Sequence, residues 1–114
     1  MTKNFESQSI QVEPAVTMFE TDSEVVIIAD LPGVEKEDLD LSLKGETLRI
    51  EGKLGLNVTQ NEQNQEIFWT GFVREIQVGD HVDVDDIKAK LENGLLRVTL
   101  GKVPSACPRK IEIT

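Results

Sequence analysis

Alternation of apolar and polar residues is the dominant pattern along this chain. Leu39, Leu41 and Leu43 are separated by polar residues, which is the period of a strand with one buried face. The apolar run at 24–31 is rich in β-branched residues and fits a central strand. Further strands are predicted by similar patterns at 15–20, 47–51, 67–78, 87–92 and 95–100. The chain is therefore expected to be all-β.

Two of these segments meet at Asn93-Gly94. This pair readily takes positive φ at both central positions of a two-residue turn, and it is the strongest short-range signal for a β-hairpin. We therefore expect 87–92 and 95–100 to be neighbouring antiparallel strands.

The number and spacing of the segments indicate the architecture. Turn signals are frequent, and only Glu35–Asp38 suggests helix, of one turn at most, so we predict an antiparallel, immunoglobulin-like β-sandwich of seven to eight strands. The amide-rich stretch 57–66 is expected to be a long loop, with at most a weakly held edge strand inside it. We divide the chain into a short flexible arm at 1–13, one domain at 14–101 and a C-terminal extension at 102–114.

Composition narrows the class of function. Lys and Arg number 12 against 21 Asp and Glu, giving a formal net charge of −9, which argues against binding nucleic acid or an anionic membrane surface. The chain lacks a signal-peptide pattern and an apolar run long enough to cross a membrane. Its single cysteine, Cys107, has no internal disulfide partner and suits a reducing compartment. We therefore expect a soluble, cytoplasmic protein.

The residues that carry catalytic or metal chemistry are few. His81 lies in an Asp-rich segment at 80–86, but the glycine and distal Glu of a calcium loop are missing. We interpret this segment as a turn whose Asp side chains bond nearby backbone N–H groups. No cationic cluster lies close enough to Cys107 in the sequence to mark it as a reactive thiol, and phosphate-loop and nucleophile-elbow motifs are missing. We expect neither an enzyme nor a bound cofactor or metal.

The C-terminal extension carries the clearest binding feature. Ile111-Glu112-Ile113 places two large apolar side chains on one face of an extended segment, after a tether broken by Pro104 and Pro108. The segment is either the last strand of its own sandwich or a plug that docks into a groove on a neighbouring copy. The residues themselves leave both readings open.

Six motifs together resemble one family. Ala89-x-x-x-Asn93-Gly94-Leu95-Leu96 resembles the signature of the α-crystallin domain of small heat-shock proteins of the bacterial type. The other five resemble that family's motifs in the same order, over roughly residues 14–114; they are Ala29–Leu39, Leu48–Gly52, Phe72–Ile76, Val82–Ala89 and Ile111–Ile113. Two departures stand out: the arm at 1–13 is short, and Leu100-Gly101-Lys102 replaces the usual L-P-K.

The resemblance implies an ATP-independent holdase chaperone, which binds partly unfolded client proteins and prevents their aggregation. It also implies self-association in two ways. A strand within 53–70 would exchange with a partner to form a dimer, whose interface would include Trp69, Arg74, Asn61, Glu62 and Gln65. Ion pairs of Arg74 would support the dimer or nearby packing.

The second implied contact involves the tail. Ile111 and Ile113 would dock between two edge strands of another dimer, here expected at 38–44 and 87–92. The inward residues of those strands would line the groove; they are Leu39, Leu41, Leu43, Ile87, Ala89 and Leu91. The family signature residues would be Ala89, Gly94, Leu95 and Leu96.

Two alternatives keep the same sandwich. One is a co-chaperone of the CS-domain type, which binds a folded partner and normally lacks the I-x-I tail and the exchanging loop. The other is a structural coat or assembly protein built on the same domain.

Overall fold

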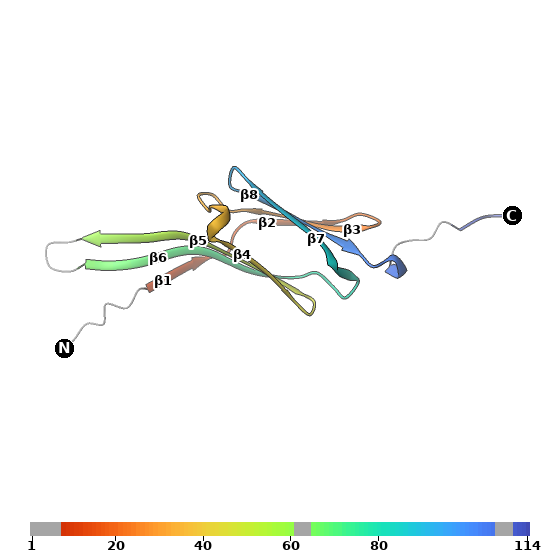
Figure 1. Ribbon diagram of the computed structural model, residues 1–114, viewed down its shortest axis with the longest axis horizontal. Coiled ribbons are helices and arrows are strands. Elements are labelled where there is room, and N and C mark those ends of the chain that lie inside the picture. The colour runs from red at the N-terminus through yellow and green to blue at the C-terminus, as the bar shows by residue number, and fades with distance from the viewer. Residues whose placement is uncertain (1–7, 61–64, 107–110) are drawn as a thin grey trace.

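Two four-stranded sheets pack face to face (Figure 1). The computed structural model describes the backbone of residues 8–60, 65–106 and 111–114, and their side chains apart from those of 8–10, 55–60, 65–70 and 106. The sheets have the strand orders β1-β6-β5-β4 and β2-β3-β8-β7. The strands are β1 (Gln8–Val12), β2 (Val16–Glu20), β3 (Glu24–Asp30), β4 (Leu39–Lys44), β5 (Thr47–Gln60), β6 (Gln65–Gln77), β7 (Val82–Glu92) and β8 (Leu95–Lys102), and two short 3-10 helices are η1 (Lys36–Asp38) and η2 (Pro104–Ala106). The predicted all-β sandwich is confirmed.

The core lies between the inner faces of the two sheets. Alternation decides which residues enter it, because successive side chains of a strand point to opposite faces. Burying a Val, Leu or Ile side chain contributes roughly 1.5–3 kcal/mol. The buried cluster consists of Val25, Ile27, Ala29, Leu31, Val34, Leu48, Ile50, Ile76, Val78, Leu96, Val98 and Leu100.

The hairpin predicted at Asn93-Gly94 joins β7 to β8. Asn93 has φ of 52° and Gly94 has φ of 77°, so both central residues adopt the left-handed conformation that this turn requires. Glu92 pairs with Leu95 across the turn, and regular pairing continues to Ile87 and Leu100. The single helical turn expected near Glu35–Asp38 is also confirmed, as η1.

The loop predicted at 57–66 is wrong for most of its length. β5 continues to Gln60 and β6 begins at Gln65, and the two strands form a long antiparallel hairpin. Its end extends past the other strands (Figure 1). Residues 61–64 lie outside the described residues. The amide-rich composition hid the strands because the pattern of apolar residues is weak there, and the hydrogen bonds of the partner strand specify them instead.

This hairpin leaves the sandwich at a point built from glycines. Gly71 crosses Gly52 so closely that a Cβ on Gly71 would lie 2.5 Å from the carbonyl oxygen of Gly52. The register of the two strands then shifts between Lys53 and Leu56, as it does at a β-bulge, which bends a strand. The outer part of the hairpin therefore begins where the backbones of two glycines approach each other closely.

Part of the arm predicted at 1–13 is a strand. β1 runs parallel to β6, with Gln8 opposite Phe68 and Val12 opposite Phe72. This corrects the expectation of a flexible arm for residues 8–12, since their backbone belongs to the first sheet. Residues 1–7 lie outside the described residues.

Candidate functional site

The two rows predicted to line a tail-docking groove lie on edge strands. β4 is the last strand of one sheet and β7 is the last strand of the other. Leu39, Leu41 and Leu43 alternate with exposed residues along β4 and are half-buried against the core. In β7, Ile87 and Leu91 are half-buried and pack on the core, while Ala89 between them is exposed. We call these six residues the edge rows; each row is apolar and only partly covered by its own chain.

The turn at Asn93-Gly94 holds the end of β7 against the rest of the domain. The N–H of Leu31 donates to the carbonyl oxygen of Gly94 at 2.7 Å. A Cβ on Gly94 would lie 3.2 Å from Cα of Pro32, so the close approach requires glycine as well as the positive φ. Of the other signature residues, Leu96 is fully buried and Leu95 is exposed.

The segment after β3 connects this turn to the other sheet. Leu31 is buried, and its carbonyl oxygen accepts the N–H of Val34 at 3.1 Å. The Val34 side chain covers Gly52, where a Cβ would lie only 3.0 Å from Cγ2 of Val34. Three motifs far apart in sequence thus meet in one place, and together they fix how the sheet carrying β4 sits over the sheet carrying β7.

The C-terminal extension starts from a well-anchored residue. The Lys102 ammonium donates to the carbonyl oxygen of Thr21 at 2.9 Å and lies 3.2 Å from Oε2 of Glu20. The Lys102 N–H donates to Ser23 at 2.8 Å, and the N–H of Val103 donates to His81 at 2.8 Å. The direction in which the tail leaves the domain is therefore set by β8 and the turn that follows β2.

Residues 111–114 of the tail are open to solvent. Ile111 is 83% exposed and Ile113 is 92% exposed, and residues 111–114 belong to no strand. The reading in which Ile111-Glu112-Ile113 is the last strand of its own sandwich is therefore wrong. Exposing two large apolar side chains so fully is unfavourable in water, which leaves them available to another surface.

Three of the five residues expected at a dimer interface belong to the described part of β6: Gln65, Trp69 and Arg74. Trp69 is opposite Leu56, and Gln65 is opposite Gln60; the side chains of these four residues are outside those described, and so are Asn61 and Glu62 altogether. Arg74 donates from Nη1 to the carbonyl oxygen of Pro14 at 2.9 Å and is partly buried. This contact ties β6 to the segment between β1 and β2. The dimer role of all five residues stays a prediction.

The Asp-rich segment forms no metal site in the part of the chain that the structure describes. There, no group of three or more His, Cys, Asp or Glu side chains is arranged to hold an ion. The N–H of Asp85 donates to Oδ1 of Asp83 at 3.0 Å, which is the local bonding expected of these side chains. His81 lies 3.3 Å from Asp80, and both are exposed. Cys107 lies outside the described residues.

No helix among the described residues is long and apolar enough to cross a bilayer.

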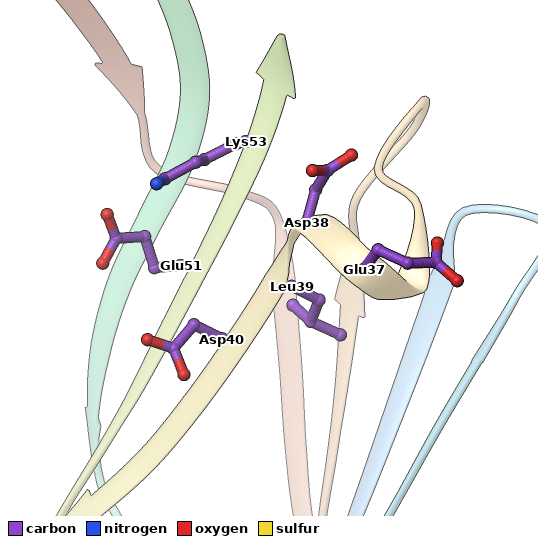
Figure 2. Close-up of a pocket in the computed structure, with 6 residues that line it drawn as sticks. All are labelled: Glu37, Asp38, Leu39, Asp40, Glu51 and Lys53. Carbon is purple, nitrogen blue, oxygen red and sulfur yellow. The ribbon is translucent and has the colours of Figure 1, made fainter.

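The sequence did not predict one feature of the structure, an acidic pocket on the outer face of β4 and β5 (Figure 2). It has a volume of about 360 Å³. It is lined by Glu37, Asp38, Leu39, Asp40, Glu51 and Lys53. The polar positions of the alternating strands were visible, but their pairing across strands depends on a register that periodicity does not give.

Comparison with known proteins identifies the family that the sequence motifs resemble. A family model described as the Hsp20/alpha crystallin family matches residues 17–114. Spore protein SP21 of Stigmatella aurantiaca is 31% identical over 106 residues, covering 88% of this chain and 61% of that protein. The probable 15 kDa heat shock protein of Leptospira interrogans is 34% identical over 101 residues, covering 88% of this chain and 77% of that protein. This chain thus spans less than two thirds of the first of these relatives.

A solved structure supports the fold as well. Heat shock protein 16.0 from Schizosaccharomyces pombe matches with a TM-score of 0.67 and 29% sequence identity, covering 90% of this chain and 97% of that one.

Proposed function

The chain belongs to the Hsp20/alpha crystallin family, and we propose that it acts as an ATP-independent holdase that keeps partly unfolded proteins from aggregating. The observation that carries the proposal is apolar surface left uncovered by the chain itself. Ile111 and Ile113 are almost fully exposed, and the edge rows are only half-buried. A protein with a net charge of −9 can hold such surface in solution, since like-charged copies repel one another.

The same surfaces support the proposal that copies assemble through their tails. Ile111 and Ile113 of one copy would pack on the edge rows of another, where the exposed Ala89 leaves room between Ile87 and Leu91. Burial of one Ile contributes roughly 1.5–3 kcal/mol, and ordering the tail offsets part of it. One docked tail is therefore weak and reversible, and several in one assembly hold by avidity.

We propose that the building block of this assembly is a dimer formed by the β5–β6 hairpin. The hairpin extends beyond the sandwich (Figure 1), and β2 is an edge strand of its sheet. An open edge offers unpaired N–H and C=O groups to a strand of another chain. The part of the hairpin beyond Gly71, predicted to contribute Trp69, Gln65, Asn61 and Glu62, would then lie against the partner, and Arg74 would stiffen its base.

The net charge of the chain bears on its partners, and its single cysteine bears on its location. The acidic balance disfavours nucleic acid and anionic membranes, so we propose aggregation-prone proteins and further copies of this chain as its partners. The single Cys107 suits the cytoplasm. We assign no catalysis and no cofactor. The comparisons give no support to a CS-domain-type co-chaperone or to a coat component.

The proposal is tested by heating a thermolabile model protein with the purified chain in the absence of ATP. We expect light scattering by the model protein to fall as the chain is added, because exposed apolar segments of the client are covered. An equal mass of an inert acidic protein is the control. Undiminished scattering at a large molar excess of this chain would refute the holdase activity.

A further inference from the structure

Two pairs of like charges lie directly opposite each other across neighbouring strands. On β4 and β5, Asp40 is paired with Glu51; on β7 and β8, Lys90 is paired with Arg97. Like charges in this position destabilise a sheet. Each outer face therefore carries a local repulsion that a complementary surface would relieve.

The basic pair belongs to a cationic patch on the outer face of β7 and β8. The inward direction of Leu96 and Val98 leaves Arg97 on the outside, and the pairing places Lys88 and Lys90 on the same face. Lys90 is 3.2 Å from Glu92. Among the described residues, Lys88 and Arg97 have no ion-pair partner. This concentration of cations contrasts with the net charge of −9 of the chain.

The acidic pair lies on the outer face of the other sheet. Figure 2 shows Asp40 and Glu51 on adjacent strands with their carboxylates on the same side. Glu51 is 3.6 Å from Arg49, which also contacts Glu75 at 2.9 Å. Asp40 has no ion-pair partner among the described residues, although the pocket beside it also includes Lys53. This face therefore presents a partly uncompensated negative charge.

We propose that the outer face of β7 and β8 docks on the outer face of β4 and β5 of a second copy, with Lys90 and Arg97 against Asp40 and Glu51. A second copy is the occupant because each chain carries both patches, and one contact relieves both repulsions. The contact is head-to-tail, since two different surfaces meet, so it extends an assembly or closes it into a ring. It leaves the inward edge rows free, and the same edge strands can bind a tail on the inside and a neighbour on the outside.

Two charge-reversed variants of the full chain test this contact. One is Asp40→Lys with Glu51→Lys, and the other is Lys90→Glu with Arg97→Glu. Each keeps a like-charged pair across its strands, and each loses one surface ion pair, Glu51 with Arg49 or Lys90 with Glu92. Because such pairs contribute little to stability, denaturant unfolding should show that both variants still fold. Both are made with Ile111→Ala and Ile113→Ala, so that tail docking does not mask the result, and mass is measured by sedimentation at about 0.05 M salt, where charge interactions are little screened.

We expect each reversed variant to associate about tenfold more weakly than the same background without reversal, because like patches then face each other. An equimolar mixture of the two variants should regain the association, since every contact is again between opposite charges. Raising the salt to about 0.5 M should weaken the unreversed chain in the same way.

Controls with the same change of net charge use exposed residues other than the four that meet in the contact; Lys44 lies on the outer face of β4, at the opposite end of the strand from Asp40. They are Asp22→Lys with Glu35→Lys, and Lys36→Glu with Lys44→Glu. The proposal is overturned if the unreversed background does not associate, if the controls lose as much association as the reversed variants, or if mixing restores nothing. None of these results depends on holdase activity.

Discussion

The two ends of the described chain carry the same short pattern and have different fates. Ile10-Gln11-Val12 and Ile111-Glu112-Ile113 each place two β-branched residues on one side of an extended segment. The first belongs to β1 and pairs with β6. The second pairs with no strand and leaves both Ile side chains in water.

The difference comes from the connection rather than from the pattern. The buried Pro14 lies two residues after the end of β1. Its carbonyl oxygen accepts a hydrogen bond from Arg74 of β6, the strand with which β1 pairs. The segment is thus held beside its edge at high effective concentration. The C-terminal segment is separated from its anchor, Lys102, by 103–110, a tether with two prolines. A segment beside a free edge of its own chain becomes a strand, and one on a long tether remains available to another chain.

The largest effect is expected where the tail is altered. Replacing Ile111 and Ile113 by Ala should weaken association by about 3 kcal/mol, or roughly a hundredfold, because two docked side chains are truncated. Light scattering should report a smaller assembly. The free energy of unfolding of the single chain should not change, since both side chains are exposed.

A matched control for the tail is Glu112→Ala, whose side chain leaves the apolar face of the segment intact. It should have the mass of the unaltered protein. An unchanged mass in the double variant would contradict tail docking.

A smaller effect should follow from releasing β1. Arg74→Met removes a charged donor from the carbonyl oxygen of Pro14, and it should lower the free energy of unfolding by about 1.5–2 kcal/mol. The amide hydrogens of 8–12 should then exchange faster, because the segment is no longer held beside β6. Denaturant unfolding and hydrogen exchange measure the two effects.

Arg49→Met serves as the comparison for Arg74, because its ion pairs with Glu51 and Glu75 are partly exposed to solvent. Such pairs contribute less than about 1 kcal/mol. Equal losses in the two variants would mean that the Pro14 contact does not hold β1.

The smallest effect is expected from Val12→Ala. Val12 is 54% exposed, so the loss should stay below about 1 kcal/mol, and the mass of the assembly should not change. A fall in mass as large as that of the tail variant would show that β1 takes part in assembly, and the contrast between the two ends would disappear.

Local signals were sufficient for much of the fold. The alternation of Leu39, Leu41 and Leu43 gave the correct buried face of β4, and Asn93-Gly94 gave the turn and the partners on each side. The extension of β5 to Gln60 was missed, because an amide-rich strand is specified by its partner and not by its own apolar side chains. β1 was missed because two apolar residues are too short a pattern, and the free edge beside them is a property of the folded chain.

The same distinction applies to the candidate site, where local signals predicted one part and the folded structure determined the rest. The sequence placed the edge rows on the correct faces, and the half-burial of Ile87 and Leu91 agrees with that. It could not distinguish the exposed Ala89 from Ile87 and Leu91, since periodicity gives the face of a strand but not how fully each position on that face is covered. The charged pairs depend on register between strands, which no single strand encodes.

The crossing of Gly71 over Gly52 has a consequence for how this domain varies. The register of β5 and β6 shifts just beyond that crossing, between Lys53 and Leu56, so the hairpin continues past the glycines in its own register. A lineage could lengthen or shorten the hairpin there while the strand pairing within the sandwich stays the same, and thereby choose a new partner. The two glycines therefore mark the position in β5 and β6 at which the length of the hairpin can change during evolution.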